Sequence, residues 1–371
     1  MTESEDFGRE PRANPDLFGH EGTEQGLLES LRNGQLAHAL LIAGPKGVGK
    51  ATLAYRFARF LLASDTEGKG EGIGGLFGPD TPPSPTGGLY VDLHSPIFKR
   101  VASAGHADLI SIERRIDEKT GKKRGEIVVE DVRGIGQFLS LTPAEGGWRI
   151  VIIDSADDLN RNAANAVLKV LEEPPRRSLL MLVSHNPGRL LPTIRSRCRK
   201  ITLKPLAEAQ IDDLVRRHRP DLAHDAAALL ARLAEGSIGR ALALADGNGI
   251  ELHRELDSLL QTLPGLDILR LHALGDRLAT AGAEDLFATA MTLLRRRLGN
   301  LARLRAAPDT RAQSVGEEDW AGRLAQAASL DRWLDVWEKI TRLLARVDGA
   351  SLDRKQVVLN VFLTLEDAVR S

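Results

Sequence analysis

The chain has 371 residues, 42% of them hydrophobic and 27% charged, which is the profile of a globular protein large enough for two or three domains. Its 50 Lys and Arg nearly cancel its 51 Asp and Glu, so no overall field draws it to nucleic acid, and any DNA contact is expected from a local patch or a partner. The single Cys198 excludes an internal disulfide and a cysteine zinc cluster, and no apolar run is long enough to span a bilayer; we therefore expect a cytoplasmic protein with no membrane partner.

Over the first half of the chain, short apolar runs alternate with helical stretches. We expect strands at 37–44, 126–132, 148–156, 178–185 and 198–203, with helices between them that include 51–64 and 162–173. Several of these runs are apolar at nearly every position, as in parallel strands that are covered on both faces. The pattern predicts an α/β fold with a parallel sheet.

The rest of the chain predicts further divisions. Residues 65–88 are rich in Gly and Pro and poor in large apolar side chains, which predicts a mobile insertion. Beyond residue 203 the pattern is helical throughout, and Trp320, Trp333 and Trp337 are expected to pack the last helices together. We predict a flexible N-terminus at 1–15, a P-loop domain at 16–205, a small helical lid at 206–249 and an all-helical domain at 250–371.

The clearest motif has the spacing G-x-x-x-x-G-K and lies between an expected strand and an expected helix. In such a loop the glycines let backbone N–H groups curl around phosphate oxygens, and the helix N-terminus and the lysine add positive charge. The residues expected to contact a nucleotide are Gly44, Pro45, Gly47, Val48, Gly49 and Lys50.

The residue after Lys50 departs from the motif. Ala51 stands where a Ser or Thr hydroxyl would ligate magnesium, and Thr52 lies about 100° further around the helix. Two interpretations stay open: a loop that binds nucleotide weakly, with Thr52 nearby, and a vestigial loop with a structural role. In the first, ATP or ADP would be held without efficient hydrolysis, and magnesium would lose a protein ligand.

An apolar run ends in Asp154, the form of a Walker B element, in which the carboxylate orders magnesium-bound water. A hydrolytic site has Glu at the next position, but here Ser155 offers a neutral hydroxyl, which is a poor base. The following Asp157 and Asp158 are interpreted as helix-capping and first-turn charges. Weak or absent intrinsic ATPase activity is therefore expected.

Three arginines occur within the stretch Arg195-Ser196-Arg197-Cys198-Arg199. Taken alone, this stretch is typical of a solvated basic turn. Its position after a P-loop and an acidic strand end favours another interpretation, in which one arginine reaches the ATP of a neighbouring subunit and stabilises charge on the transferred phosphoryl group.

Three segments together resemble the bacterial clamp-loader family of AAA+ proteins, and the resemblance covers roughly residues 16–245. They are GPKGVGK (44–50), DSADDLNRNAANAVLKVLEEPP (154–175) and TIRSRC (193–198). The resemblance implies an AAA+ domain, a lid and a C-terminal oligomerising collar. Lost hydrolytic residues beside an intact Ser196-Arg197-Cys198 are similar to the delta-prime pattern of that family.

The resemblance also implies roles and partners. Arg197, with Ser196, would be an arginine finger donated in trans, and Asn186 would occupy the sensor 1 position. The implied partners are gamma/tau and delta subunits in a hetero-pentamer that loads a sliding clamp on primed DNA during replication. The complex belongs to the DNA polymerase III holoenzyme, a DNA-directed DNA polymerase and nucleotidyltransferase, but this chain would carry no polymerase chemistry itself.

Two departures from the family pattern stand out. Relatives with a zinc site have four cysteines after the first helix, whereas this chain has only His94 and His106 in that region, so no zinc is expected. Gly239 stands where motor subunits carry the sensor 2 arginine, with Arg240 displaced by one. Two alternatives remain open: an active gamma/tau-like motor subunit, and a free-standing P-loop ATPase unrelated to replication.

Overall fold

The computed structural model describes residues 10–67, 88–117, 121, 124–145, 147–307, 319–350 and 352–370. Residues 1–9 of the expected flexible N-terminus and 68–87 of the expected insertion lie outside this part of the chain. Two compact units are present, Met1–Asp221 with Ala234–Arg240, and Leu222–Leu233 with Ala241–Ser371. The predicted division into three domains stays a prediction.

A parallel sheet with helices forms the first unit. Its strands are β1 (Ala39–Ala43), β2 (Leu109–Ile112), β3 (Arg149–Ile153), β4 (Ser178–Ser184) and β5 (Arg199–Thr202). Its helices are α1 (Glu21–Arg32), α2 (Lys50–Glu67), α3 (Pro96–Ala102), α4 (Val129–Val132), α5 (Ile135–Ser140), α6 (Arg161–Glu172), α7 (Pro192–Arg195) and α8 (Glu208–His218), with 3₁₀ turns η1 (Ala156–Asp158) and η2 (Pro187–Arg189).

The five strands lie in the order β2-β3-β4-β1-β5 and every pair is parallel. Strand β1 pairs with β4 on one side and β5 on the other, so the loop that follows β1 leaves from the interior of the sheet. The predicted parallel α/β class is confirmed.

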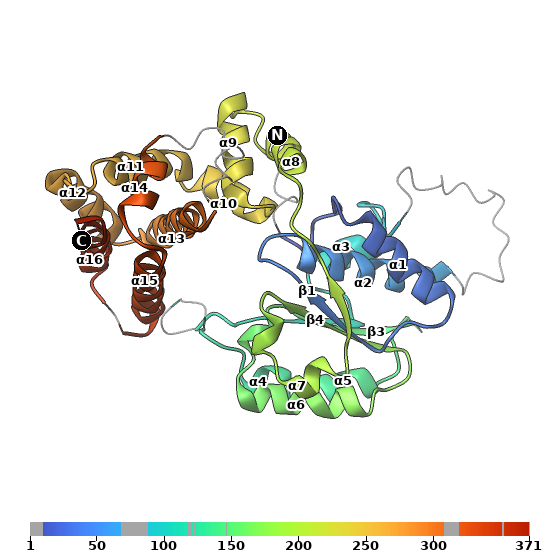
Figure 1. Cartoon of the computed structure of the whole chain (residues 1–371). Coiled ribbons are helices and arrows are strands. Elements are labelled where there is room, and N and C mark those ends of the chain that lie inside the picture. Colours follow the sequence, from blue (N-terminus) through green and yellow to red (C-terminus); the bar gives the residue numbers. More distant parts are fainter. Residues whose placement is uncertain are drawn as a thin grey trace. The chain divides into compact units, whose positions relative to one another are not determined.

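Helices cover both faces of the sheet, with α1, α2 and α3 on one face and α4 to α7 on the other (Figure 1). Alternate residues of β1 serve the two faces: Leu40 and Ile42 pack with α2, whereas Ala39 and Leu41 pack with α6. Because β1, β3 and β4 are buried at every position, the near-continuous apolar runs seen in the sequence are explained.

The predicted strand at 126–132 is wrong. The Asp131 carboxylate accepts the N–H of Val128 at 3.0 Å, so the chain turns into α4, and only Ile127 makes a bridge, to Leu159. The missing strand is β2, the edge of the sheet, which is partly exposed and contains Ser111. Its short apolar run lacked the signal of a strand buried on both faces.

A buried arginine ties the start of the described chain to the sheet domain. Arg59 on α2 is 1% exposed and donates to the carbonyl oxygens of Arg12 and Asn14, at 2.7 and 2.6 Å. Its guanidinium also lies 4.5 Å from the ring centroid of Phe98. Residues 12–14, within the segment predicted to be flexible, are therefore held in place.

The later elements are all helical. They are α9 (His224–Ala234), α10 (Ile238–Asp246), α11 (Gly249–Gln261), α12 (Ile268–Ala279), α13 (Glu284–Ala306), α14 (Asp319–Ala327), α15 (Leu330–Ala350) and α16 (Arg354–Arg370). Trp333 is fully buried and Trp320 nearly so, as expected, but Trp337 is 39% exposed and packs less than predicted. None of the helices within the described ranges has the length and apolar character to span a membrane.

Candidate functional site

The loop 44–49 joins β1 to α2 and depends on its glycines. Gly44 and Gly47 have φ angles of 148° and 79°, values that side chains disfavour. A Cβ on Gly47 would lie 2.3 Å from Ser237 Oγ, and one on Gly44 would lie 2.5 Å from the carbonyl oxygen of Leu203. No larger residue fits either position without moving its neighbours.

Residues 237–239 close over this loop through hydrogen bonds to its backbone. Ser237 Oγ donates to the carbonyl oxygen of Lys46 at 2.8 Å, and the N–H of Gly239 donates to that of Gly47 at 3.0 Å. A Cβ on Gly239 would lie 3.0 Å from the Cα of Gly47. The absence of a side chain at Gly239 is what lets the two backbones approach so closely.

The neighbouring carbonyl groups of the loop also have partners. Lys50 Nζ donates to the carbonyl oxygen of Pro45 at 2.5 Å, and the His20 ring contacts that of Val48 at 2.8 Å. Within the described residues, no backbone carbonyl accepts a hydrogen bond from the N–H groups of residues 46–49, so these donors are available to an anion.

Lys50 is 3% exposed, and burial lowers its pKa to about 8, against the opposing charges of Asp154 and Asp157. Thr52 is 7% exposed, among the buried residues of α2. The structure thus places the lysine near the carboxylates at the end of β3, whereas Thr52 is buried on α2.

The end of β3 brings a serine and a histidine together. Asp154 follows the strand, and its N–H donates to the carbonyl oxygen of Ile112 at 2.8 Å. Ser155 has a φ of 60°, and its Oγ lies 3.3 Å from His185 Nε2. Burial, and after it the charge of Lys50, lower the pKa of His185, so its ring is neutral at pH 7 and is a partner for a hydroxyl group.

Asp157 joins the ends of β3 and β4. Its carboxylate accepts hydrogen bonds from Ser184 Oγ at 2.6 Å, from the N–H of His185 and from the N–H of Asn186 at 3.2 Å. Asp157 does not cap α6, whose cap is Asn160, but it is a first-turn charge, as predicted, in the turn η1.

Asp158, the other residue interpreted as a helix charge, also lies in the first turn of η1 and pairs with Arg114 at 3.1 Å. Asn186, the predicted sensor 1 residue, is exposed, and its assignment stays a prediction. Burial and the charge of Lys50 lower the pKa of the preceding residue, His185, and no motif in the sequence pointed to this histidine. The only signal in the sequence was its place directly after an apolar strand.

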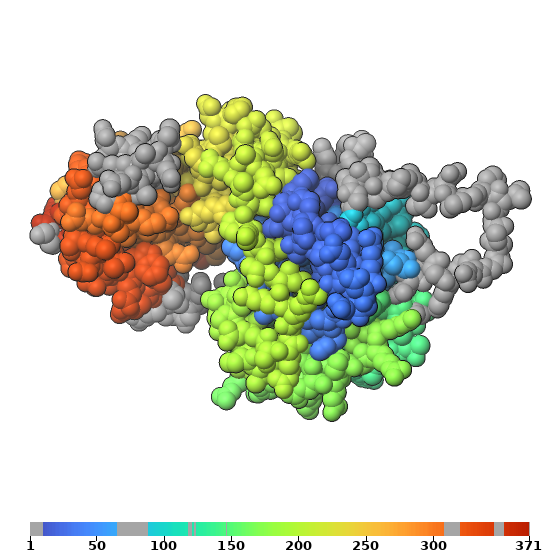
Figure 2. Space-filling model, turned by 45° about the vertical axis from the view of Figure 1, so that its right-hand side comes forward, coloured from blue at the N-terminus to red at the C-terminus, as the bar shows by residue number. Residues whose placement is uncertain are grey.

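Arg197 is the second residue after α7 and lies at the surface, with its side chain 36% exposed. Figure 2 shows yellow-green residues, near 200 in the sequence, at the surface beside the blue residues of the N-terminal helix, in agreement with the 2.8 Å bond from Arg199 to Ser30 on α1. Arg197 contacts Glu172 and Thr193, so the structure does not bring it to its own P-loop. Ser196 Oγ also donates to Thr193, and burial raises the pKa of the Cys198 thiol to about 12.

Comparison with known proteins gives consistent matches. The model of a family described as "DNA polymerase III, delta subunit" matches residues 91–207. DNA polymerase III subunit delta' of Pseudomonas aeruginosa is 35% identical over 204 residues, 55% of this chain and 54% of that protein. The Escherichia coli delta' subunit is 30% identical over 275 residues, 74% of each chain.

The chain belongs to the DNA polymerase III delta-prime family. It spans about half the length of the Pseudomonas relative. DNA polymerase III subunit tau of Escherichia coli is 30% identical over 262 residues, but these are only 36% of that protein. The delta-prime interpretation is thus favoured over the gamma/tau alternative.

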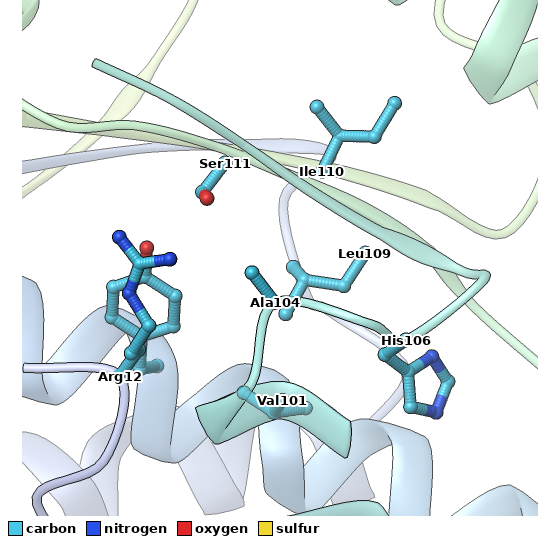
Figure 3. Close-up of a pocket in the computed structure, with 8 residues that line it drawn as sticks. Arg12, Val101, Ala104, His106, Leu109, Ile110 and Ser111 are labelled. Carbon is cyan, nitrogen blue, oxygen red and sulfur yellow. The ribbon is translucent and has the colours of Figure 1, made fainter.

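In this delta-prime family member, a separate cavity of about 210 Å³ lies between α3 and the edge strand β2, and Arg12 and Tyr55 also line it. The Arg12 guanidinium and the Ser111 hydroxyl lie toward the same end of the cavity, and the His106 ring points away from these two groups (Figure 3). None of the predicted site residues lines this cavity. We assign it no role in the candidate site.

Replacing Asp157 by Asn should loosen the junction between β3 and β4. A carboxylate that accepts several hydrogen bonds stabilises the folded chain by roughly 1–3 kcal/mol more than an amide does. The reason is that the NH₂ group of the amide would face N–H groups, which are also donors. We expect the free energy of unfolding measured in urea to fall by that amount, and amide hydrogen exchange at residues 184–186 to accelerate. Asp158→Asn, one residue away on a partly exposed pair, is the control; an equal loss there would contradict the role given to Asp157.

Proposed function

We propose that this chain is the delta-prime subunit of a clamp loader and acts as a scaffold that does not hydrolyse ATP efficiently. It joins gamma/tau and delta subunits in a cytoplasmic hetero-pentamer and offers Arg197 to the ATP of an adjacent motor subunit. The complex opens a sliding clamp and loads it on primed DNA during replication. As a member of the DNA polymerase III holoenzyme, the chain supplies no polymerase chemistry.

The observation that carries this proposal is the pairing of an outward arginine with an incomplete hydrolytic site. Arg197 is exposed on a surface turn and is not directed to its own P-loop. At the end of β3, Ser155 bonds to a neutral His185 where an acidic residue would polarise water. Arg197 can thus stabilise charge in the ATP site of a neighbouring subunit, whereas this chain's own site has no catalytic base.

The P-loop itself fits a bound nucleotide. The N–H groups of residues 46–49, which no backbone carbonyl of the described residues accepts, and Lys50 suit the phosphates of ATP or ADP. Magnesium lacks its usual hydroxyl ligand, because Ala51 has none and Thr52 is buried. We propose passive nucleotide binding, in which these groups hold phosphates without activating water.

The pKa of Lys50 gives this binding a pH dependence. Because burial lowers the pKa to about 8, and phosphate binds only the charged ammonium, ADP affinity should fall as the pH rises through about 8. The fall approaches about tenfold per pH unit above that value. Isothermal titration with magnesium-free ADP between pH 6.5 and 9.5 measures it. A Lys50→Arg variant stays charged and should bind with a flat profile; a flat profile for the unmodified chain would contradict this assignment.

Reconstitution with gamma/tau and delta subunits tests the proposed function. The isolated chain should release phosphate from ATP at a rate close to background. The assembled complex should turn over ATP when clamp and primed DNA are added, and a complex lacking this chain should not. Robust turnover by the isolated chain would instead favour the motor-subunit alternative, and failure to assemble would favour a free-standing P-loop protein.

A further inference from the structure

Arg197 is already bound within its own chain. Its Nη2 lies 2.8 Å from Oε1 of Glu172, and its Nη1 donates to the carbonyl oxygen of Thr193 at 3.1 Å. Two of the guanidinium nitrogens therefore have acceptors before any neighbouring subunit is present. A phosphate must compete with these acceptors to bind the guanidinium.

The position of Glu172 adds to this hold. It is the last residue of α6, where unpaired carbonyl groups give the helix end a partial negative charge. The carboxylate and the helix end attract the same guanidinium. Glu173, the next residue, is also exposed but is not the carboxylate paired with Arg197.

We propose that Glu172 is a positioning residue that holds Arg197 in a retracted orientation, from which it is released when the phosphates of a neighbouring nucleotide compete for the guanidinium. This inference rests on the proposed function, because it assumes that Arg197 acts in trans. A triphosphate carries more negative charge than one carboxylate and offers several oxygens to the arginine fork. The nucleotide therefore wins the competition when it is bound.

The exposure of the pair sets the size of the effect. The side chains of Arg197 and Glu172 are 36% and 50% exposed, and exposed pairs of this kind shift an equilibrium by about two- to fivefold. Glu172 therefore orients the arginine without locking it. Glu172→Gln keeps the size of the side chain and removes its charge, so it should lower the KM for ATP of the complex by about two- to fivefold. The kcat should not change, because the engaged state has no contact with Glu172.

Steady-state ATPase assays of the reconstituted complex test this, with wild-type chain, Glu172→Gln, Arg197→Ala and the double variant. Glu173→Gln is the matched control, because it removes the same charge one residue away and should behave as wild type. The decrease in KM should shrink at high salt, where an exposed ion pair is screened. Thermal unfolding of each isolated variant reports any loss of fold.

The possible outcomes distinguish a failure of this inference from a failure of the proposed function. Unchanged turnover with Arg197→Ala would overturn the trans role of the arginine. A large loss with Arg197→Ala, together with a wild-type KM for Glu172→Gln, would leave that role intact and overturn the retracted orientation. An equal change in KM when Glu172→Gln is made in the Arg197→Ala background would also overturn it, because the glutamate would then act without the arginine.

Discussion

Removing the Arg197 side chain is expected to reduce ATP turnover at the site that receives it by roughly 10³-fold, the scale of a missing arginine finger. The physical reason is that the guanidinium, once it has engaged the bound nucleotide, stabilises the charge that develops on the transferred phosphoryl group. Phosphate release by the reconstituted complex, with clamp and primed DNA present, measures the loss. If the other sites hydrolyse ATP only after this one has done so, the ATP turnover of the whole complex also falls.

Two further variants make this result specific. Arg195→Ala removes an exposed arginine two residues earlier and should leave turnover near that of the wild type. Arg197→Lys keeps the charge but loses the planar fork, so we expect it to restore only part of the activity. Equal losses for Arg195→Ala and Arg197→Ala would show a general charge effect and contradict the assignment.

The second large effect is expected in the helical unit. Trp333 on α15 is 0% exposed, and its Nε1 donates to the carbonyl oxygen of Ala325 at 3.3 Å. Truncating a buried Trp to Ala costs about 3–5 kcal/mol, from lost burial and the cavity left behind. We expect Trp333→Ala to lower the unfolding temperature of this unit, while the sheet-bearing unit keeps its own transition. Calorimetry combined with hydrogen exchange resolves the two.

Trp337 on the same helix supplies the control. Its side chain is 39% exposed, so Trp337→Ala should cost under about 1 kcal/mol, as surface substitutions usually do. If both variants destabilise the unit equally, the core is not centred where the structure places it. A simultaneous loss of the sheet transition in Trp333→Ala would show instead that the two units unfold together.

Three of the predicted strands are buried on both faces, which leaves a local signal in the sequence. Nearly every position of β1, β3 and β4 is apolar for that reason. β5 is largely exposed and was predicted as well. β2 was missed because its apolar run is only four residues long and the strand is partly exposed. The run at 126–132 had the right composition, but the Asp131 cap decided its conformation, and capping competes with a strand through a single hydrogen bond.

The candidate site divides in the same way. The loop 44–50 could be predicted because its chemistry is local: glycine spacing and one lysine. The roles of Asp157 and His185 could not, because they depend on β3 and β4 lying side by side. Sequence shows that Asp157 follows a strand, but only the fold shows which N–H groups it meets.

The close approach of Gly239 to Gly47 bears on how such a subunit changes over evolutionary time. Restoring the sensor 2 arginine at position 239 would introduce a Cβ 3.0 Å from the Cα of Gly47, beside backbone that cannot yield as a flexible side chain does. An arginine at position 239 would therefore disturb this contact before it could bind a phosphate. Position 51 would still lack a hydroxyl ligand for magnesium, and position 155 would still lack an acidic side chain. If the chain does not hydrolyse ATP, as we propose, this backbone contact is a structural obstacle to gaining that activity by single mutations.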